Sequence, residues 1–336
     1  MITPMQRWLK RLFCCLAAVF LIITIGIAWI GSKQTLSPKR RSIESYHQVI
    51  LDQPAHYGLS ISSFIASEGT PCMVCEPVAP TSADQTIAHK SRLLRHELTL
   101  RNAPLARWGQ IRGTIFMLHG HRGCKEDHLP ICERFCAAGF RCLLIDIPGH
   151  GSSPHPYATF GYRESEMIPA IWQEYQDSHG LSNSPLFLFG YSQGGAISLL
   201  TAAKYPQKIC AIASISAFSS LENPIAASAK HLPPVIRQLT PLTTRACALG
   251  IYLRAGFFPS AVQPSRAASM ISCPVFLSHG LDDSFVSADQ AQQIYHAIPG
   301  NQKNLKLIPA AKHHNTLSTG STALYADICE HFLHAL

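Results

Sequence analysis

Six short apolar runs recur between residues 113 and 310, and segments with helical features separate most of them. Each run has the length of a single strand and carries little charge, which is typical of strands buried on both faces of a sheet. The runs lie at residues 114–118, 142–147, 186–190, 209–216, 273–278 and 305–309. Strands that alternate with helices in this way predict an α/β fold with a mostly parallel central sheet and helices on both faces.

The segments after residue 287 show helical spacing most clearly, because apolar residues recur every three or four positions. These residues are Ala291, Ile294, Tyr295 and Ile298 in one segment and Leu324, Ile328, Phe332 and Leu336 in the last. Residues 218–268 break the alternation, since they are rich in Ala, Pro and Leu and favour helices. We expect a small helical cap there, inserted after one strand.

The chain before residue 113 is less regular. It becomes strand-like from about His56, with a turn at Gly69 between two extended stretches. Residues 80–110 contain Pro, Ser, Asp and Asn without clean periodicity, and they predict an irregular excursion or a hairpin. Residues 32–55 begin polar and basic and predict a linker, so the main domain is expected to span residues 56–336.

Residues 12–31, LFCCLAAVFLIITIGIAWIG, carry no charge and are long enough to cross the ~30 Å hydrocarbon core of a bilayer as a helix. A cleaved signal peptide is the main alternative, because Arg7, Lys10 and Arg11 precede the run. The run exceeds the usual ~7–15 residues of a signal peptide, however, and no convincing cleavage site follows. Residues 1–31 therefore predict a single-pass membrane anchor. Basic residues flank both ends, so the side of the membrane stays open.

The net charge of +8 could suggest a nucleic-acid-binding protein, but the charge is localised. Residues 1–45 hold seven Lys and Arg residues and one acid, which leaves only +2 for the rest of the chain. The basic character belongs to the ends of the apolar segment, and no basic groove for phosphates is indicated.

Twelve cysteines are scattered through the chain, mostly within apolar stretches, where free cysteine behaves as a small buried hydrophobic residue. Cys72 and Cys75 form a CxxC motif, but no second pair completes a zinc site. No Walker loop or dinucleotide fingerprint is present either. The sequence predicts neither a metal nor a cofactor.

The central chemical signal is Gly190-Tyr191-Ser192-Gln193-Gly194, which matches the pattern GxSxG. The pattern alone is weak. Here it follows the apolar run LFLF and precedes AISLLTAAKY, a good helix former, which is the strand–turn–helix context of a nucleophile elbow. We therefore expect Ser192 to be a nucleophile.

A serine hydroxyl needs a base, and that base needs an orienting acid. Acids follow the strand at 273–278 in the segment HGLDD, and histidines follow the strand at 305–309 in HHN. Both positions lie at the carboxyl edge of a parallel sheet, as does the elbow. The residues by themselves leave two choices open, Asp282 or Asp283 as the acid and His313 or His314 as the base.

The loop after the strand at 114–118, with the sequence HGHRG, could supply part of an oxyanion hole. A tetrahedral intermediate places negative charge on oxygen, and fixed backbone N–H groups stabilise that charge. One donor should be the N–H of Gln193, directly after the nucleophile. The other should come from this loop, and His121 is the expected residue.

The motifs HGHRG, DIPGHGSS, GYSQGG, CPVFLSHGLDD and HHN together resemble the α/β-hydrolase superfamily. More narrowly, they resemble its lysophospholipase-like and serine-aminopeptidase-like esterase group, some members of which carry an N-terminal anchor. The resemblance covers about residues 56–336. It implies an α/β-hydrolase fold with the acid at the last position of HGxxD, Asp283, and the base before Asn, His314. It also implies structural roles for His119 and Asp146.

The expected function is hydrolysis of carboxylic esters through an acyl-enzyme, with lipid or lysophospholipid esters among the candidate substrates. A peptidase or an acyltransferase could use the same triad. From a different class, a non-catalytic binding module tethered to a membrane is the third hypothesis. The expected partners are the ester substrate and the membrane, and the sequence leaves the oligomeric state open.

Overall fold

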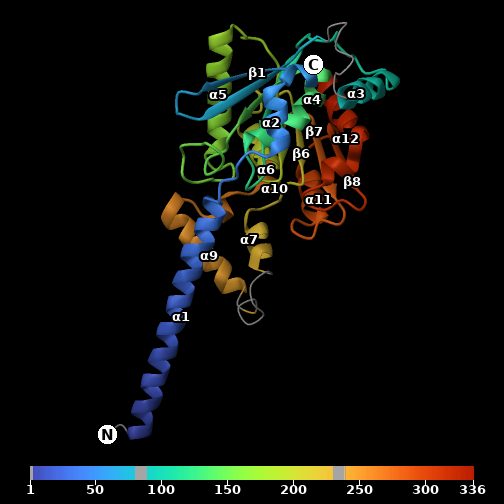
Figure 1. Cartoon of the computed structure of the whole chain (residues 1–336). Coiled ribbons are helices and arrows are strands. Elements are labelled where there is room, and N and C mark those ends of the chain that lie inside the picture. Colours follow the sequence, from blue (N-terminus) through green and yellow to red (C-terminus); the bar gives the residue numbers. More distant parts are fainter. Residues whose placement is uncertain (1–2, 80–88, 230–237, 239) are drawn as a thin grey trace.

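The computed structural model describes residues 3–79, 89–229, 238 and 240–336. One eight-stranded sheet runs through this part of the chain in the order β1-β2-β4-β3-β5-β6-β7-β8 (Figure 1). The strands are β1 (Leu59–Ile65), β2 (Pro71–Pro77), β3 (Gly113–Leu118), β4 (Phe140–Ile145), β5 (Leu186–Tyr191), β6 (Ala211–Ile215), β7 (Val275–Gly280) and β8 (Lys303–Ile308). Strands β3 to β8 are parallel, and β1 and β2 form an antiparallel edge. The predicted sheet and its six strand runs are confirmed.

Helices cover both faces of this sheet (Figure 1). The α-helices of the described part of the chain are α1 (Pro4–Leu36), α2 (Ser45–Asp52), α3 (His89–Leu100), α4 (Leu129–Ala137), α5 (Glu164–His179), α6 (Gln193–Lys204), α7 (Glu222–Ser228), α9 (Thr240–Ala255), α10 (Pro264–Ala268), α11 (Ala288–Ala297) and α12 (Thr316–Leu333). Buried side chains of α2, α3, α4 and α12 form one core with the sheet. Those of α5, α6, α10 and α11 form a second core on its other face.

The edge hairpin confirms the strand-like character expected from His56 onward. Gly69 occupies the turn between β1 and β2 with φ +85°, a region that favours glycine. Along β2, Cys72 and Cys75 lie three positions apart and belong to the cores on opposite faces of the sheet. Their thiols point away from one another, so this CxxC cannot hold a metal between its two sulfurs.

The prediction of an irregular excursion over 80–110 is wrong for residues 89–100, which form α3. Residues 80–88 lie outside the described residues. Ser91, Leu94 and Leu98 are buried at spacings of three and four, while the rest of the helix is mostly polar or exposed. This narrow apolar stripe is a weak signal in the sequence. It is enough to stabilise the helix because α4 and α12 cover it in the folded protein.

The linker prediction for residues 32–55 also needs correction, because helix forms at both ends of this segment. Helix α1 continues to Leu36, which is fully buried, and α2 occupies Ser45–Asp52. His47 and Ile50 of α2 are buried as well. Residues expected to be solvated therefore pack onto the domain, where tertiary contacts compensate for their polar composition.

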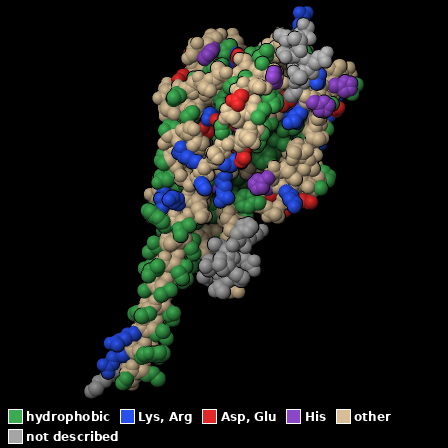
Figure 2. All heavy atoms as spheres, viewed as in Figure 1, with side chains coloured by type: hydrophobic (Ala, Val, Ile, Leu, Met, Phe, Trp, Pro, Cys, Tyr) green, Lys and Arg blue, Asp and Glu red, His purple; other side chains and the backbone are tan. Residues whose placement is uncertain are grey.

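Helix α1 projects from the body of the molecule (Figure 1). Its mean hydropathy over the best 18-residue window is 2.7, and none of that window is buried, so it is long and apolar enough to cross a membrane. The same properties occur in signal sequences. The projecting part is covered by hydrophobic side chains, with basic residues near its free end (Figure 2).

The segment predicted as a cap, 218–268, contains α7, α9 and α10 in its described part. Helix α10 packs against α6 and α11 and belongs to the body. Helix α9 instead packs along α1 (Figure 1). The two helices approach closely at Gly250, where a Cβ would lie only 2.2 Å from the carbonyl oxygen of Ala28. The extent of a cap over the sheet stays a prediction.

Leu98→Ala tests the packing of α3. We expect it to lower the free energy of unfolding by about 2–5 kcal/mol, because Leu98 is fully buried and its truncation leaves a cavity. Leu93→Ala on the same helix is the matched control, because that side chain is 40% exposed; it should change stability by no more than about 0.5 kcal/mol. Thermal or denaturant unfolding of the detergent-solubilised protein measures both. Equal effects would contradict this packing.

Candidate active site

Ser192 lies in a sharp turn between β5 and α6. Its backbone has φ 52° and ψ −109°, a strained conformation for a residue with a side chain. Glycines on both sides allow it. A Cβ at Gly190 would lie 2.1 Å from the Gly194 carbonyl oxygen, and a Cβ at Gly194 would lie 1.9 Å from the carbonyl oxygen of Leu118. The turn therefore has the geometry expected of a nucleophile elbow.

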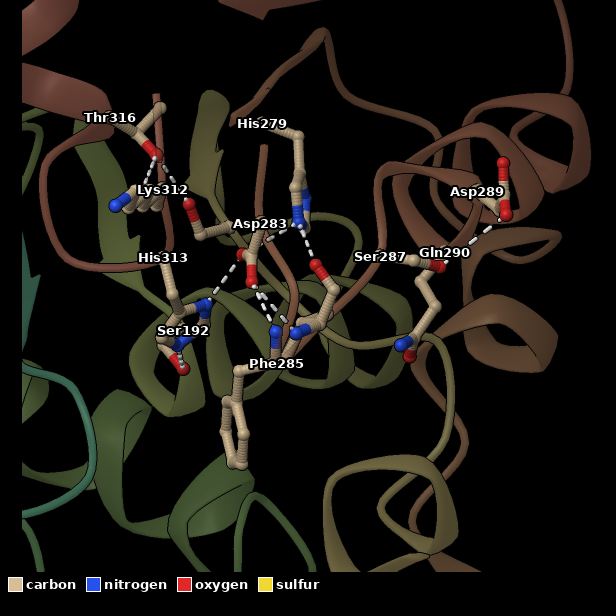
Figure 3. Close-up of polar contacts among 12 residues, drawn as sticks. Ser192, His279, Asp283, Phe285, Ser287, Asp289, Gln290, Lys312, His313 and Thr316 are labelled. Carbon is tan, nitrogen blue, oxygen red and sulfur yellow. Dashed lines mark hydrogen bonds and ion pairs between the residues drawn. The ribbon is translucent and has the colours of Figure 1, made fainter. Parts of the chain in front are cut away.

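Three side chains from separate loops meet at the carboxyl edge of the sheet (Figure 3). Ser192 Oγ lies 2.9 Å from Nε2 of His313, and Nδ1 of His313 lies 2.6 Å from Oδ2 of Asp283. These residues follow β5, β8 and β7 respectively. All three are buried. The arrangement is a continuous Ser–His–Asp hydrogen-bonded chain.

Asp283 is held by donors on both carboxylate oxygens. Oδ1 accepts the backbone N–H groups of Phe285 and Val286, at 3.0 and 2.8 Å. Oδ2 also lies 3.1 Å from Nε2 of His279. Burial by itself would raise the pKa of Asp283, but the hydrogen bonds from His279, His313 and Val286 hold that pKa well below its usual value. The carboxylate therefore stays ionised at neutral pH.

The geometry contradicts the expectation that His314 lies beside the serine. His313 occupies that place, while the side chain of His314 is exposed. The two residues are consecutive in one turn, so only one of them can point toward the elbow. For the acid, the preferred Asp283 is the buried residue in contact with histidine, and Asp282 is exposed.

Two side chains that the sequence analysis did not single out support this arrangement. His279 shares Asp283 with His313, and its Nε2 also lies 2.8 Å from the carbonyl oxygen of Val286. The hydroxyl of Tyr191, next to Ser192, donates to the carbonyl oxygen of His313. The HGLDD and GYSQG motifs contained both residues, but only the folded chain brings them to Asp283 and His313.

The loop between β3 and α4 that contains residues 119–123, here called the oxyanion loop, lies against the elbow. A Cβ on Gly120 would be 3.7 Å from Cβ of Ser192. The ring of His119 fixes this loop, because Nδ1 lies 2.8 Å from the Gly120 carbonyl oxygen and Nε2 accepts the N–H of Ile147 at 3.1 Å. The expected donor residues, His121 and Gln193, occupy the loop and the first position of α6.

Asp146 holds the neighbouring segment. It accepts the backbone N–H groups of Lys125 and Ser152, both at 2.9 Å, and pairs with the Lys125 ammonium at 2.9 Å. The contacts of His119 and Asp146 are those of residues that shape loops, which agrees with the structural roles that the resemblance implied. Neither hydrogen-bonds to Ser192 or His313 in the part of the chain that the structure describes.

The end of α1 docks onto the oxyanion loop, which the sequence did not predict. Nε2 of His121 lies 3.0 Å from the carbonyl oxygen of Thr35 on α1. The next residue, Leu36, accepts the N–H of Ala158 at 2.7 Å. Arg40 then donates to two backbone carbonyl oxygens of the 151–153 turn, at 2.9 and 2.7 Å. The apolar helix is thus joined directly to the site.

Comparison with known proteins agrees with this architecture. The sequence model of the α/β-hydrolase fold matches residues 113–243. The chain has the α/β-hydrolase fold. Among the structures similar to it, an esterase of Pyrococcus furiosus aligns with a TM-score of 0.61 and 16% identity, covering 89% of this chain and 98% of its own. A structure described as a membrane phospholipase A, a bacterial virulence factor, aligns with a TM-score of 0.53 and 16% identity, covering 98% of this chain and 99% of its own.

Sequence relatives match over shorter segments of this chain. A caffeoylshikimate esterase of Arabidopsis thaliana is 32% identical over 96 residues, 27% of this chain and 29% of the relative. Lipase 3 of a Moraxella species is 32% identical over 95 residues, 28% of this chain and 29% of the relative. The chain thus spans less than a third of the length of these two relatives.

Buried histidines around the site should make this protein sensitive to acid. Burial lowers the pKa of His128 to about 3 and that of His121 to about 4, and it also lowers the pKa values of His119 and His150. In the unfolded chain each would titrate near 6.5. Stability is therefore complete above that pH and falls as the pH drops below it, by about 1.4 kcal/mol per pH unit for each such group.

His128→Gln tests this prediction through the slope of stability against pH. Between about pH 6 and 4 we expect a shallower slope, because one proton fewer is taken up on unfolding. His96→Gln, at an exposed position of α3, should leave the slope unchanged. Unfolding of the detergent-solubilised protein across this pH range measures both. A His128→Gln slope equal to that of the wild type would show that this histidine does not contribute.

Proposed function

We propose that this chain is a membrane-anchored serine hydrolase that cleaves carboxylic acyl esters through an acyl-enzyme. The observation that carries the proposal is the hydrogen-bonded chain from Ser192 through His313 to Asp283, with the serine on a strained elbow. A scaffold or binding module has no physical need for all three groups in this order. The esterases and lipases among its relatives support the same reaction class.

In the proposed mechanism, Ser192 attacks the ester carbonyl carbon while Nε2 of His313 takes the hydroxyl proton. Asp283 keeps the other ring nitrogen of His313 protonated and stabilises the imidazolium that forms. When the tetrahedral intermediate collapses, His313 returns the proton to the leaving alcohol and Ser192 retains the acyl group as an ester. Water activated by His313 then attacks this ester, releases the carboxylic acid and restores the serine.

The negative oxygen of each tetrahedral intermediate is assigned to the backbone N–H groups of Gln193 and His121. Gln193 begins α6, so its N–H lies at a helix N-terminus, where amide groups lack intrahelical acceptors and attract negative charge. His121 lies in the oxyanion loop, one residue after the glycine that approaches Ser192. The pair is therefore suitably located to stabilise an oxyanion.

We assign lipid-like acyl esters as the substrate class, since the apolar helix α1 leads directly to the oxyanion loop. The solved membrane phospholipase A, whose alignment covers 98% of this chain, and a monoacylglycerol lipase of Paleococcus ferrophilus with a TM-score of 0.52 support this assignment. In this proposal α1 anchors the enzyme, and the bilayer presents the substrate. Peptide hydrolysis and acyl transfer use the same triad, and product analysis with added acceptors distinguishes them.

The first test is labelling of the full-length, detergent-solubilised protein by a fluorophosphonate. We expect one modified residue, Ser192, because activated serines react with this electrophile and ordinary hydroxyls do not. Ser192→Ala should abolish both the label, mapped by mass spectrometry, and ester hydrolysis. Ser198→Ala, in α6, is the control and should label normally. An unlabelled wild-type protein that is folded by circular dichroism would refute the proposed activity.

A pair of neighbouring substitutions tests the choice of base. His313→Asn should reduce kcat for a p-nitrophenyl ester by about 10³-fold or more, because the serine loses its proton acceptor. His314→Asn changes an exposed ring in the same turn and should retain most of the activity. The reverse pattern would assign the base to His314 and would contradict the observed geometry.

A further inference from the structure

A surface cavity of about 790 Å³ lies where α1 meets the body of the protein. Trp29, Ile30 and Lys33 of α1 contribute to it, followed by Lys39 from the segment after the helix and by Arg122 of the oxyanion loop. Lys and Arg side chains gather at this junction (Figure 2). The cavity, called the headgroup cavity below, therefore joins the end of α1 to the loop beside the nucleophile.

The cations of this cavity are not neutralised by the protein. No acid lines it, and no ion pair involves Lys33, Lys39 or Arg122 among the described residues. Two neighbouring arginines behave differently, since Arg40 binds backbone carbonyl oxygens and Arg41 pairs with an aspartate at 2.6 Å. Three like charges around one open space favour an anion between them.

Toward the projecting part of α1 the cavity is lined by Trp29 and Ile30, and the guanidinium of Arg254 on α9 lies 3.7 Å from the centroid of the Trp29 ring. The side chains of Trp29 and Ile30 are 64% and 57% exposed. On α9, which packs along α1, Leu249 and Leu253 are 50% and 74% exposed. Tryptophan near the end of an apolar helix is typical of the membrane interface, and lysines beyond it lie at the level of lipid headgroups.

The cavity also borders the site. Arg122 follows His121, whose ring contacts the carbonyl oxygen of Thr35 on α1 at 3.0 Å. Two residues before Arg122, Gly120 approaches Ser192. With its anionic group in the cavity, a ligand would therefore be able to extend between the bilayer and the oxyanion loop.

We propose that the headgroup cavity binds the phosphate of an anionic phospholipid or lysophospholipid and so selects phosphate-bearing acyl esters from the bilayer. Lys33, Lys39 and Arg122 supply charge-assisted hydrogen bonds to the phosphate oxygens, and Trp29 and Ile30 contact the glycerol and the start of the acyl chain. This inference rests on the proposed function, since it assumes that α1 lies in the membrane and that Ser192 cleaves the ester.

The test compares lysophosphatidylglycerol with a monoacylglycerol of the same acyl chain, in neutral detergent micelles with the full-length protein. We expect kcat/KM to favour the phosphate-bearing ester. Lys33→Gln/Lys39→Gln should reduce that preference about tenfold, because two of the three cations are lost. The matched control, Lys10→Gln/Arg11→Gln, removes two charges from the other end of α1 and should keep the preference. The same ratio in all three proteins would overturn the proposal.

A binding experiment separates this proposal from the proposed function. Ser192→Ala cannot turn over the ester, so lysophosphatidylglycerol should raise its Tm more than the monoacylglycerol does. The added Lys33→Gln/Lys39→Gln change should abolish that difference. Selective binding without hydrolysis by the wild-type protein would support the headgroup cavity and refute the proposed esterase activity. Hydrolysis without selective binding would support the esterase activity and refute the headgroup cavity. Equal stabilisation by inorganic phosphate alone would exclude a lipid headgroup as the specific ligand.

Discussion

The turn at Ser192 depends on two close backbone contacts. Gly190 lies against the carbonyl group of Gly194, and Gly194 lies against the carbonyl group of Leu118 at the end of β3. In both places a Cβ atom would collide with the carbonyl oxygen. These contacts let α6 begin directly above the sheet while φ at Ser192 stays at 52°. Because α6 starts there, its N-terminus and the loop that follows β3 face the same hydroxyl. The remaining parts of the site are arranged around this turn.

A second constraint is that one buried carboxylate serves two histidines. Asp283 contacts His279 and His313 through Oδ2 and two backbone N–H groups through Oδ1, which accounts for an ionised carboxylate in a buried position. Tyr191 holds the carbonyl of His313 from the side of the elbow. His313 is thus held by Asp283 through its ring and by Tyr191 through its carbonyl oxygen.

Helix α1 has a closer relation to the site than a flexible tether would have. Its last turn contacts the ring of His121, and the chain after it binds the turn at 151–153. The α/β-hydrolase fold hosts many reactions, so fold alone does not select a substrate. In this chain the distinguishing feature is the junction of α1, α9 and the oxyanion loop, where apolar and basic surfaces meet. In the proposed function, this junction sets the distance between the bilayer and the serine.

The sequence by itself determined the parallel sheet, the turn at Ser192 and the segments that bring Asp283 and a histidine to the same edge, because these depend on local patterns: apolar runs, a GxSxG between strand and helix, and polar residues directly after strands. It could not determine which of two adjacent histidines turns inward, since His313 and His314 differ only in the direction of their side chains within one turn. It missed α3, whose apolar stripe becomes informative only against α4 and α12. It also missed the docking of α1 on the oxyanion loop, because contacts such as that between His121 and Thr35 join residues 86 positions apart and leave no local pattern.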